Sequence, residues 1–128
     1  MNYLLDTHAF IWWNENSPKL PVHVRQTLSD RSNQIWLSHA SIWELQIKIQ
    51  LGKLKLGASL ADLIDQETRV NRLRLLSISY DNILKLDSLP MHHRDPFDRM
   101  IIAQTLTGGF HLVACDSEFP AYGVPLFW

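Results

Sequence analysis

The 128-residue sequence has a single cysteine, no long hydrophobic run and nearly equal numbers of acidic and basic side chains. With only Cys115 present, an internal disulfide is excluded, as is typical of proteins in a reducing compartment. No stretch reaches the length of a transmembrane helix, and the N-terminus lacks the charged and then apolar segments of a signal peptide. The net charge of −1 provides no global field that attracts nucleic acid. We therefore expect a cytosolic protein without membrane contact.

Motifs for several kinds of catalysis are also missing. The chain contains neither a glycine-rich phosphate-binding loop nor a Gly-x-Ser-x-Gly turn. None of the six histidines has the spacing of zinc ligands, and the adjacent His92 and His93 are expected to lie in a surface loop. Cys115 is expected within an apolar strand, where a thiol is unreactive. The sequence therefore gives no support for serine, cysteine or zinc chemistry.

The elements that are present predict one α/β domain spanning residues 1–128. Short apolar strands alternate with amphipathic segments, which indicates a parallel sheet with helices on both faces. The strands are expected at residues 2–5, 35–37, 73–78, 112–115 and 124–128, and the helices at 8–13, 21–30, 39–51, 60–71, 79–86 and 96–107.

Residues 39–51 are the ambiguous segment. Apolar and polar residues alternate from Trp43 to Leu51, which is typical of a strand. Ser41 to Glu44 nevertheless has the form of a capping box, and the segment is rich in helix-forming residues. We predict a helix, with Trp43 in the core.

Asp95 to Arg99 has the pattern of a helix start. Asp95 is a suitable N-cap and Pro96 a suitable first helical residue. Asp98 then falls on the side of the helix that should face the core, where a carboxylate costs several kcal/mol, roughly, unless hydrogen bonds or a cation compensate it. Its alternative explanation is a favourable interaction with the helix dipole.

Four acidic residues are predicted near one edge of the sheet. Asp6 and Asp116 directly follow strands, Glu44 lies one helical turn beyond a strand, and Asp98 begins a neighbouring helix. Singly, each has a structural explanation: Asp6 and Asp116 as N-caps, and Glu44 as an exposed partner of Lys48. Together, carboxylates without cationic partners repel one another and require retained protons or divalent cations. Oxygen ligands favour Mg²⁺ or Mn²⁺ over zinc, and such ions at this position suggest phosphodiester hydrolysis.

In order and spacing, four motifs resemble those of a PIN domain. They are Leu4-Leu5-Asp6-Thr7, Ser41 to Leu45, Asp95 to Ala103, and Cys115-Asp116 followed by Tyr122-Gly123-Val124. Over essentially its whole length the chain is similar to VapC-type toxin ribonucleases of type II toxin–antitoxin pairs. The resemblance implies a three-layer α/β/α sandwich with a mainly parallel five-stranded sheet in the order 3-2-1-4-5. It further implies a Mg²⁺- or Mn²⁺-dependent endoribonuclease whose catalytic and metal-binding residues are Asp6, Glu44, Asp98 and Asp116.

The chain departs from the PIN-domain pattern at one site residue. The resemblance also implies protein partners. Many relatives carry Thr or Ser where this chain has Ala114, so Thr7 or Ser117 is the candidate helper in place of that hydroxyl. Proteins of this kind form homodimers and hold an antitoxin segment in a groove lined by the early helices. We expect Trp12 or Trp13 in such a groove, because two adjacent tryptophans cannot both face one core. Trp36, like Trp43, is expected in the core.

Basic residues near one linker are candidate contacts to the RNA backbone. They are Lys48, Lys53 and Lys55, and the alternative is that they form a solvated helix face. Two other functions stay open: a catalytically idle PIN-like binding module, and another metal-dependent phosphate hydrolase. A haloacid-type phosphatase would carry a second Asp where this chain has His8.

Overall fold

Five parallel strands form one sheet in the order β3-β2-β1-β4-β5, as predicted. The computed structural model describes all residues from 1 to 128. The strands are β1 (Asn2–Leu5), β2 (Gln34–Ser38), β3 (Arg74–Leu76), β4 (His111–Val113) and β5 (Leu126–Phe127). The third, fourth and fifth strands are shorter than expected, so more of the chain lies in the loops beside them.

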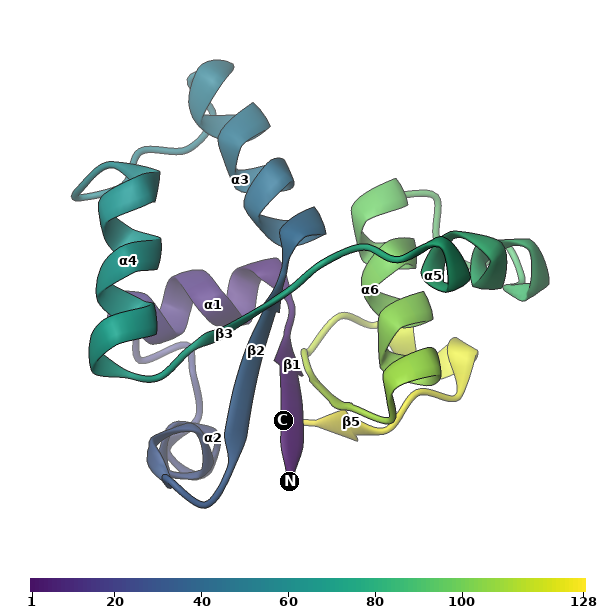
Figure 1. The fold of residues 1–128 in the computed structure, drawn as a ribbon, viewed down its shortest axis with the longest axis horizontal. Coiled ribbons are helices and arrows are strands. Elements are labelled where there is room, and N and C mark those ends of the chain that lie inside the picture. The colour runs from purple at the N-terminus through teal and green to yellow at the C-terminus, as the bar shows by residue number, and fades with distance from the viewer.

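Six α-helices cover the two faces of the sheet (Figure 1). They are α1 (Thr7–Asn14), α2 (Val22–Ser29), α3 (His39–Gln50), α4 (Leu60–Val70), α5 (Tyr80–Lys85) and α6 (Pro96–Gly108), with 3₁₀ turns at Leu86–Ser88 and Phe119–Tyr122. One apolar cluster packs α1, α2 and part of α3 on one face, and a second packs α6 on the other. The predicted three-layer α/β/α arrangement is therefore confirmed. No helix has the combination of length and apolar composition that crossing a membrane requires.

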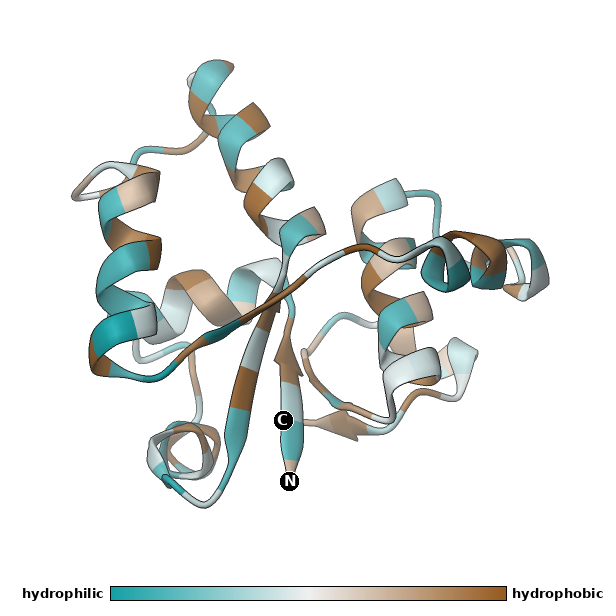
Figure 2. Ribbon diagram, viewed as in Figure 1, coloured by the Kyte–Doolittle hydropathy of each residue, from teal (hydrophilic) through white to brown (hydrophobic).

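Successive side chains of β1 pack alternately into the two apolar clusters. Tyr3 and Leu5 belong to the cluster with α1 and α2, whereas Leu4 belongs to the cluster with α6. Successive side chains of a strand point to opposite faces, so a strand buried on both faces is apolar throughout. Figure 2 shows hydrophobic segments on β1 and β2, interrupted by paler and hydrophilic ones, and mixed colouring on the helices.

The predicted start and stop of α6 are confirmed. The Asp95 carboxylate accepts hydrogen bonds from the backbone N–H groups of Phe97 and Asp98, and Gly109 ends the helix with a φ of 68°. In the left-handed region glycine has no Cβ to clash, so it suits this position.

The helical interpretation of residues 39–51 is also confirmed, but its predicted cap is wrong. Ser38 caps α3 by accepting from the N–H of Ala40, while Ser41 is buried and its hydroxyl has no hydrogen-bond partner. Trp43 is 60% exposed and not in the core. The buried stripe of α3 runs through residues 40, 41, 44 and 45, and position 43 lies to one side of it.

Two further expectations about single residues need correction. Cys115 lies beyond the end of β4 and is exposed, so it is not held inside a strand. Burial raises the pKa of its thiol, with Asp6 and Asp116 contributing, so the neutral thiol persists despite this exposure. Trp36 is only partly buried; its ring meets Phe110 edge-on and packs against the cluster under α6.

Candidate metal centre

Asp6 joins the ends of two neighbouring strands. It directly follows β1, and its backbone N–H donates to the carbonyl of Val113 at the end of β4, at 3.1 Å. Its Oδ1 accepts a 2.7 Å hydrogen bond from the N–H of Ala9, so Asp6 is indeed the N-cap of α1. The side chain is nevertheless buried, and Oδ2 accepts no hydrogen bond. The cap therefore fixes one carboxylate oxygen and leaves the other available.

Glu44 reaches the same region from α3. It is buried, and its Oε1 accepts a 2.6 Å hydrogen bond from the hydroxyl of Thr7 at the start of α1. Its Oε2 lies 3.0 Å from the Nζ of Lys48, one helical turn later. Glu44 thus does pair with Lys48, contrary to the expectation of four acids without cationic partners. The alternative explanation, in which Glu44 is an exposed partner of Lys48, is also wrong, because Glu44 is buried.

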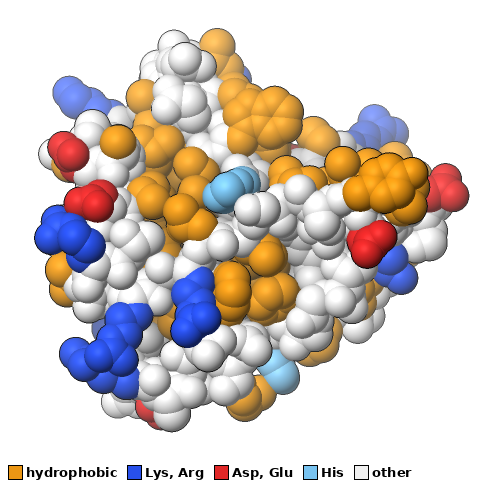
Figure 3. Space-filling model, in the orientation of Figure 1, with side chains coloured by type: hydrophobic (Ala, Val, Ile, Leu, Met, Phe, Trp, Pro, Cys, Tyr) orange, Lys and Arg blue, Asp and Glu red, His pale blue; other side chains and the backbone are white.

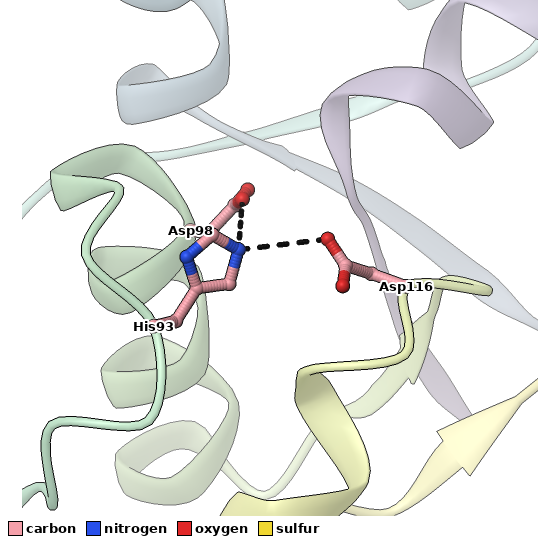
Figure 4. Close-up of side chains that lie close together, drawn as sticks. All are labelled: His93, Asp98 and Asp116. Carbon is pink, nitrogen blue, oxygen red and sulfur yellow. Dashed lines mark ion pairs between the residues drawn. The ribbon is translucent and has the colours of Figure 1, made fainter.

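Asp98 and Asp116 face one another across a histidine (Figure 4). The His93 Nε2 lies 2.9 Å from Oδ2 of Asp98 and 3.5 Å from Oδ2 of Asp116. Asp116 is also held by its other oxygen, which accepts from the N–H of Glu118 at 2.8 Å. All three side chains are partly buried. His93 therefore belongs to the site, and its expected position as a surface loop residue is wrong.

Burial, with mutual repulsion added to it, raises the pKa of two of the acids. Burial raises the pKa of Asp6 to about 7, and the charges of Asp98, Asp116 and Glu44 add to the rise. The pKa of Asp98 is also raised to about 7, by burial first and then by Asp95, Glu44 and Asp116, against a lowering effect of His93. Because each of the four acids appears among these causes, their carboxylates share one electrostatic environment. This is the clustering predicted from the topology.

The donor set fits a hard divalent cation. The Nε2 of His93 and the carboxylate oxygens of Asp98 and Asp116 all lie within 4.8 Å of one another, and Asp6 and Glu44 add carboxylate charge beside them. Two ligands at right angles on one ion lie about 3 Å apart when each bond is about 2.1 Å long. The observed separations from Nε2 are 2.9 and 3.5 Å. A cation there would also offset the burial and the mutual repulsion that raise the pKa values of Asp6 and Asp98.

The loop that carries His93 is hydrogen-bonded to α6 and to the last 3₁₀ turn. The backbone N–H of His93 donates to the hydroxyl of Tyr122 at 2.7 Å. The Arg99 guanidinium donates to the carbonyls of Pro90 and Leu86 at 2.9 and 3.2 Å, and lies 3.4 Å from the same hydroxyl. These contacts were not predicted, because no local pattern links a loop histidine to an arginine in the following helix.

The remaining candidates lie outside the acidic cluster or at its edge. Ser117 is exposed and makes no hydrogen bond through its hydroxyl, and Lys53 and Lys55 are exposed without ion pairs. Of the adjacent tryptophans, Trp13 is buried in the core. Trp12 is partly exposed and packs beside Trp128, with ring centroids 5.7 Å apart.

A second surface feature is an apolar hollow between α3 and α4. It has a volume of about 740 Å³. The hydrophobic residues lining it are Ile42, Trp43, Leu60, Ala61, Ile64 and Leu75. Figure 3 shows hydrophobic side chains gathered in it. None of the four clustered acids lines this hollow, so it is separate from the candidate metal centre.

Both the sequence and the fold of this chain are similar to those of known proteins. The family model described as the PIN domain matches residues 3–125. Among curated protein sequences no significant match is found.

Solved structures with similar folds include toxin–antitoxin complexes. VapBC2 from Rickettsia felis, bound to a DNA fragment from their promoter, is 19% identical with a TM-score of 0.75, covering 99% of this chain and 98% of the other. DNA-bound VapBC from Salmonella typhimurium is 21% identical with a TM-score of 0.73, covering 99% and 97%. FitAcB from Neisseria gonorrhoeae is 17% identical with a TM-score of 0.66, covering 98% and 96%. At these identities the likeness establishes a shared fold.

Proposed function

Because the chain belongs to the PIN domain family, we propose that it is a metal-dependent endoribonuclease and the toxin of a type II toxin–antitoxin pair. The observation that carries the proposal is the convergence of Asp6, Glu44, Asp98 and Asp116 from four separate segments at one end of the sheet. Gathering four carboxylates, two of them buried and two partly buried, is unfavourable for folding, and so it is expected where function requires it.

Each acid has a defined role in this proposal. Asp6 and Asp98, whose pKa values are raised to about 7, would hold a Mg²⁺ or Mn²⁺ ion together with Asp116 and Glu44. Such an ion supplies charge neutralisation at a phosphodiester and lowers the pKa of water. Thr7 and Lys48 hold Glu44 through its two oxygens, so Thr7 acts on the site through Glu44. Ser117, exposed beside Asp116, remains the candidate for a substrate contact in place of the hydroxyl missing at Ala114.

A cleavage assay tests the proposal directly. Purified protein is incubated with a structured RNA in Mg²⁺, in Mn²⁺ and in EDTA, beside the Asp98→Asn variant. As a matched control, Asp81→Asn makes the same change in charge at an exposed position in α5. We expect metal-dependent cleavage by the wild type and by Asp81→Asn, and none by the folded Asp98→Asn protein.

Other outcomes of the assay support the alternatives. RNA binding without cleavage in any metal would favour a catalytically idle binding module. Hydrolysis of a small phosphate monoester, with intact RNA, would favour a different metal-dependent phosphate hydrolase. Either result contradicts the proposed activity.

The partner proposal concerns the surface around Trp12. We propose that the protein forms a homodimer and that a cognate antitoxin covers Trp12, whose ring is partly exposed between Trp128 and Lys19. Trp12→Ala should lower antitoxin affinity and cost less stability than the same change at Trp13, because Trp12 is only partly buried. Trp13→Ala should instead cost about 3–5 kcal/mol of stability, because that side chain is buried. Unchanged affinity in a folded Trp12→Ala protein would rule out this contact.

A further inference from the structure

His93 has two possible roles, which the separation of its Nε2 from the acids does not distinguish. At 2.9 Å from Oδ2 of Asp98 and 3.5 Å from Oδ2 of Asp116, Nε2 is placed either as a third ligand of one cation or as a hydrogen-bond donor to the carboxylates. A ligand must present a bare nitrogen lone pair, whereas a donor must carry the proton on Nε2. The other ring nitrogen decides between them.

The other nitrogen, Nδ1, faces a backbone donor. The N–H of Asp95 points at Nδ1 of His93, with a nitrogen–nitrogen separation of 3.2 Å. A backbone amide cannot accept a hydrogen bond through its N–H, so Nδ1 must supply the lone pair and the ring proton must be on Nε2. Histidines that bind metals show the opposite arrangement, in which the nitrogen away from the metal donates to an acceptor.

From this arrangement we propose that His93 is a positioning residue whose protonated Nε2 lies against the carboxylates of Asp98 and Asp116, and that it is not a metal ligand. The inference rests on the proposed function, since it concerns how the same carboxylates are held for their cation. Oδ2 of Asp98 lies 2.9 Å from Nε2, while its Oδ1 has no ion-pair or hydrogen-bond partner and is left for the ion. A donor placed between Asp98 and Asp116 also offsets part of their repulsion before any ion arrives.

The ring is fixed on several sides, as a positioning role requires. Its backbone is tied to the Tyr122 hydroxyl, Nδ1 is tied to the Asp95 N–H, and the ring lies against Phe119 at a centroid distance of 6.0 Å. Hydrogen-bond partners that orient metal ligands typically contribute 10–100-fold to metal affinity, roughly. His93 would make that contribution to both Mg²⁺ and Mn²⁺ equally, because it does not contact the ion itself.

Three measurements on the full-length protein test the assignment. Imidazole ¹⁵N NMR of the metal-free protein at pH 8 should show His93 protonated at Nε2, the signal being identified by its loss in His93→Gln. Electron spin echo spectroscopy of the Mn²⁺ complex should show no coupling to a directly bound imidazole nitrogen. Calorimetric titration with Mg²⁺ and Mn²⁺ should show that His93→Ala loses roughly 10–100-fold in affinity for both ions by a similar factor. His93→Gln, whose amide places an N–H near the same point, should recover much of that loss.

Three other results would contradict the assignment of His93 as a positioning residue. A nitrogen coupling in the wild-type Mn²⁺ complex that disappears in His93→Ala, or a loss of Mn²⁺ affinity far greater than that of Mg²⁺, would make His93 a ligand and overturn the proposal. So would unchanged affinity for both ions in a folded His93→Ala protein. If the wild type binds neither ion, the proposed function fails, and the NMR measurement alone then decides whether Nε2 is the donor.

Discussion

The Thr7 hydroxyl and Oε1 of Glu44 lie 2.6 Å apart, joining two buried side chains that are 37 residues apart in the sequence. This contact connects the start of α1 to the buried stripe of α3. It also gives a buried carboxylate one of the donors that it needs. Thr7 was predicted as a helper to substrate or metal, and its observed partner is an acid of the site.

The first prediction is that Thr7→Val destabilises the protein. Valine has nearly the same shape but no hydroxyl, so Oε1 of Glu44 would be left buried without its donor. Removing one partner of a buried hydrogen bond costs about 1–3 kcal/mol. Urea unfolding should show this loss, and Thr7→Ser, which keeps the hydroxyl, should lose less. Equal stability of the valine variant and the wild type would contradict the assigned contact.

The second prediction concerns stability against pH in EDTA. The pKa of Asp6 is raised from 3.8 in the unfolded chain to about 7 when folded, and that of Asp98 likewise. For a raised pKa, the favourable contribution is complete below the unfolded value and is lost as pH rises through the folded value. Each group lowers the free energy of unfolding by at most about 1.4 kcal/mol per pH unit in this window. The melting temperature should therefore fall between pH 5 and pH 8; a rise across that range would contradict the raised pKa values of Asp6 and Asp98.

The third prediction is that neutralising Asp6 separates stability from metal binding. In EDTA at pH 8, Asp6→Asn should be more stable than the wild type, because it removes one charge from a repelling group while Asn still caps α1. The wild type should gain stability when Mn²⁺ is added, whereas Asp6→Asn should gain much less. Thermal melts with and without the ion measure both effects. An equal gain in the two proteins would mean that Asp6 does not hold the ion.

Local sequence patterns predicted those parts of the structure that local physics controls. Asp95 and Gly109 bound α6 as expected, because capping depends on a few neighbouring residues. The parallel topology then placed Asp6 and Asp116 at the same sheet edge. Convergence of these two acids followed from strand order and needed no knowledge of side-chain contacts.

Features that depend on contacts distant in sequence were missed. Trp43 was assigned to the core because tryptophan is usually buried, yet the stripe of α3 that faces inward is set by Glu44 and Leu45 beside it. His93 was treated as a surface residue because its role arises from the packing of its loop against Tyr122 and Asp98. Its position five residues before Asp98 was the only available signal, and that spacing has no general meaning.

The fourth prediction tests the lysines proposed to contact RNA. Lys53 and Lys55 are exposed and have no ion-pair partner, so their charges are free to meet phosphates. Replacing both with Gln should weaken RNA binding and reduce the slope of log affinity against log salt by about 1.4, since each contact to a single strand contributes about 0.7. Binding is measured with Asp98→Asn in the background, so that RNA stays intact. An unchanged slope would show that these lysines belong to a solvated face.

The fifth prediction is that Arg99 stabilises the loop on which His93 depends. Its guanidinium donates to the carbonyls of Leu86 and Pro90 and lies near the Tyr122 hydroxyl that also accepts from His93. A lysine keeps the charge but has no planar fork to span two carbonyls. Arg99→Lys should therefore cost about 1–3 kcal/mol in urea unfolding. If Arg99 holds the loop, the same variant should also bind Mn²⁺ more weakly, although it removes no carboxylate.

Arg94 provides the control for that experiment. It lies in the same loop, is exposed and makes no hydrogen bond or ion pair through its side chain, so Arg94→Lys should leave stability and metal affinity unchanged. Loss of stability in Arg99→Lys without loss of metal affinity would mean that the loop keeps His93 in place without this arginine. Loss of both confirms that the acidic centre is built from the loop as well as from the sheet edge, because α6 alone positions Asp98 but not the imidazole beside it.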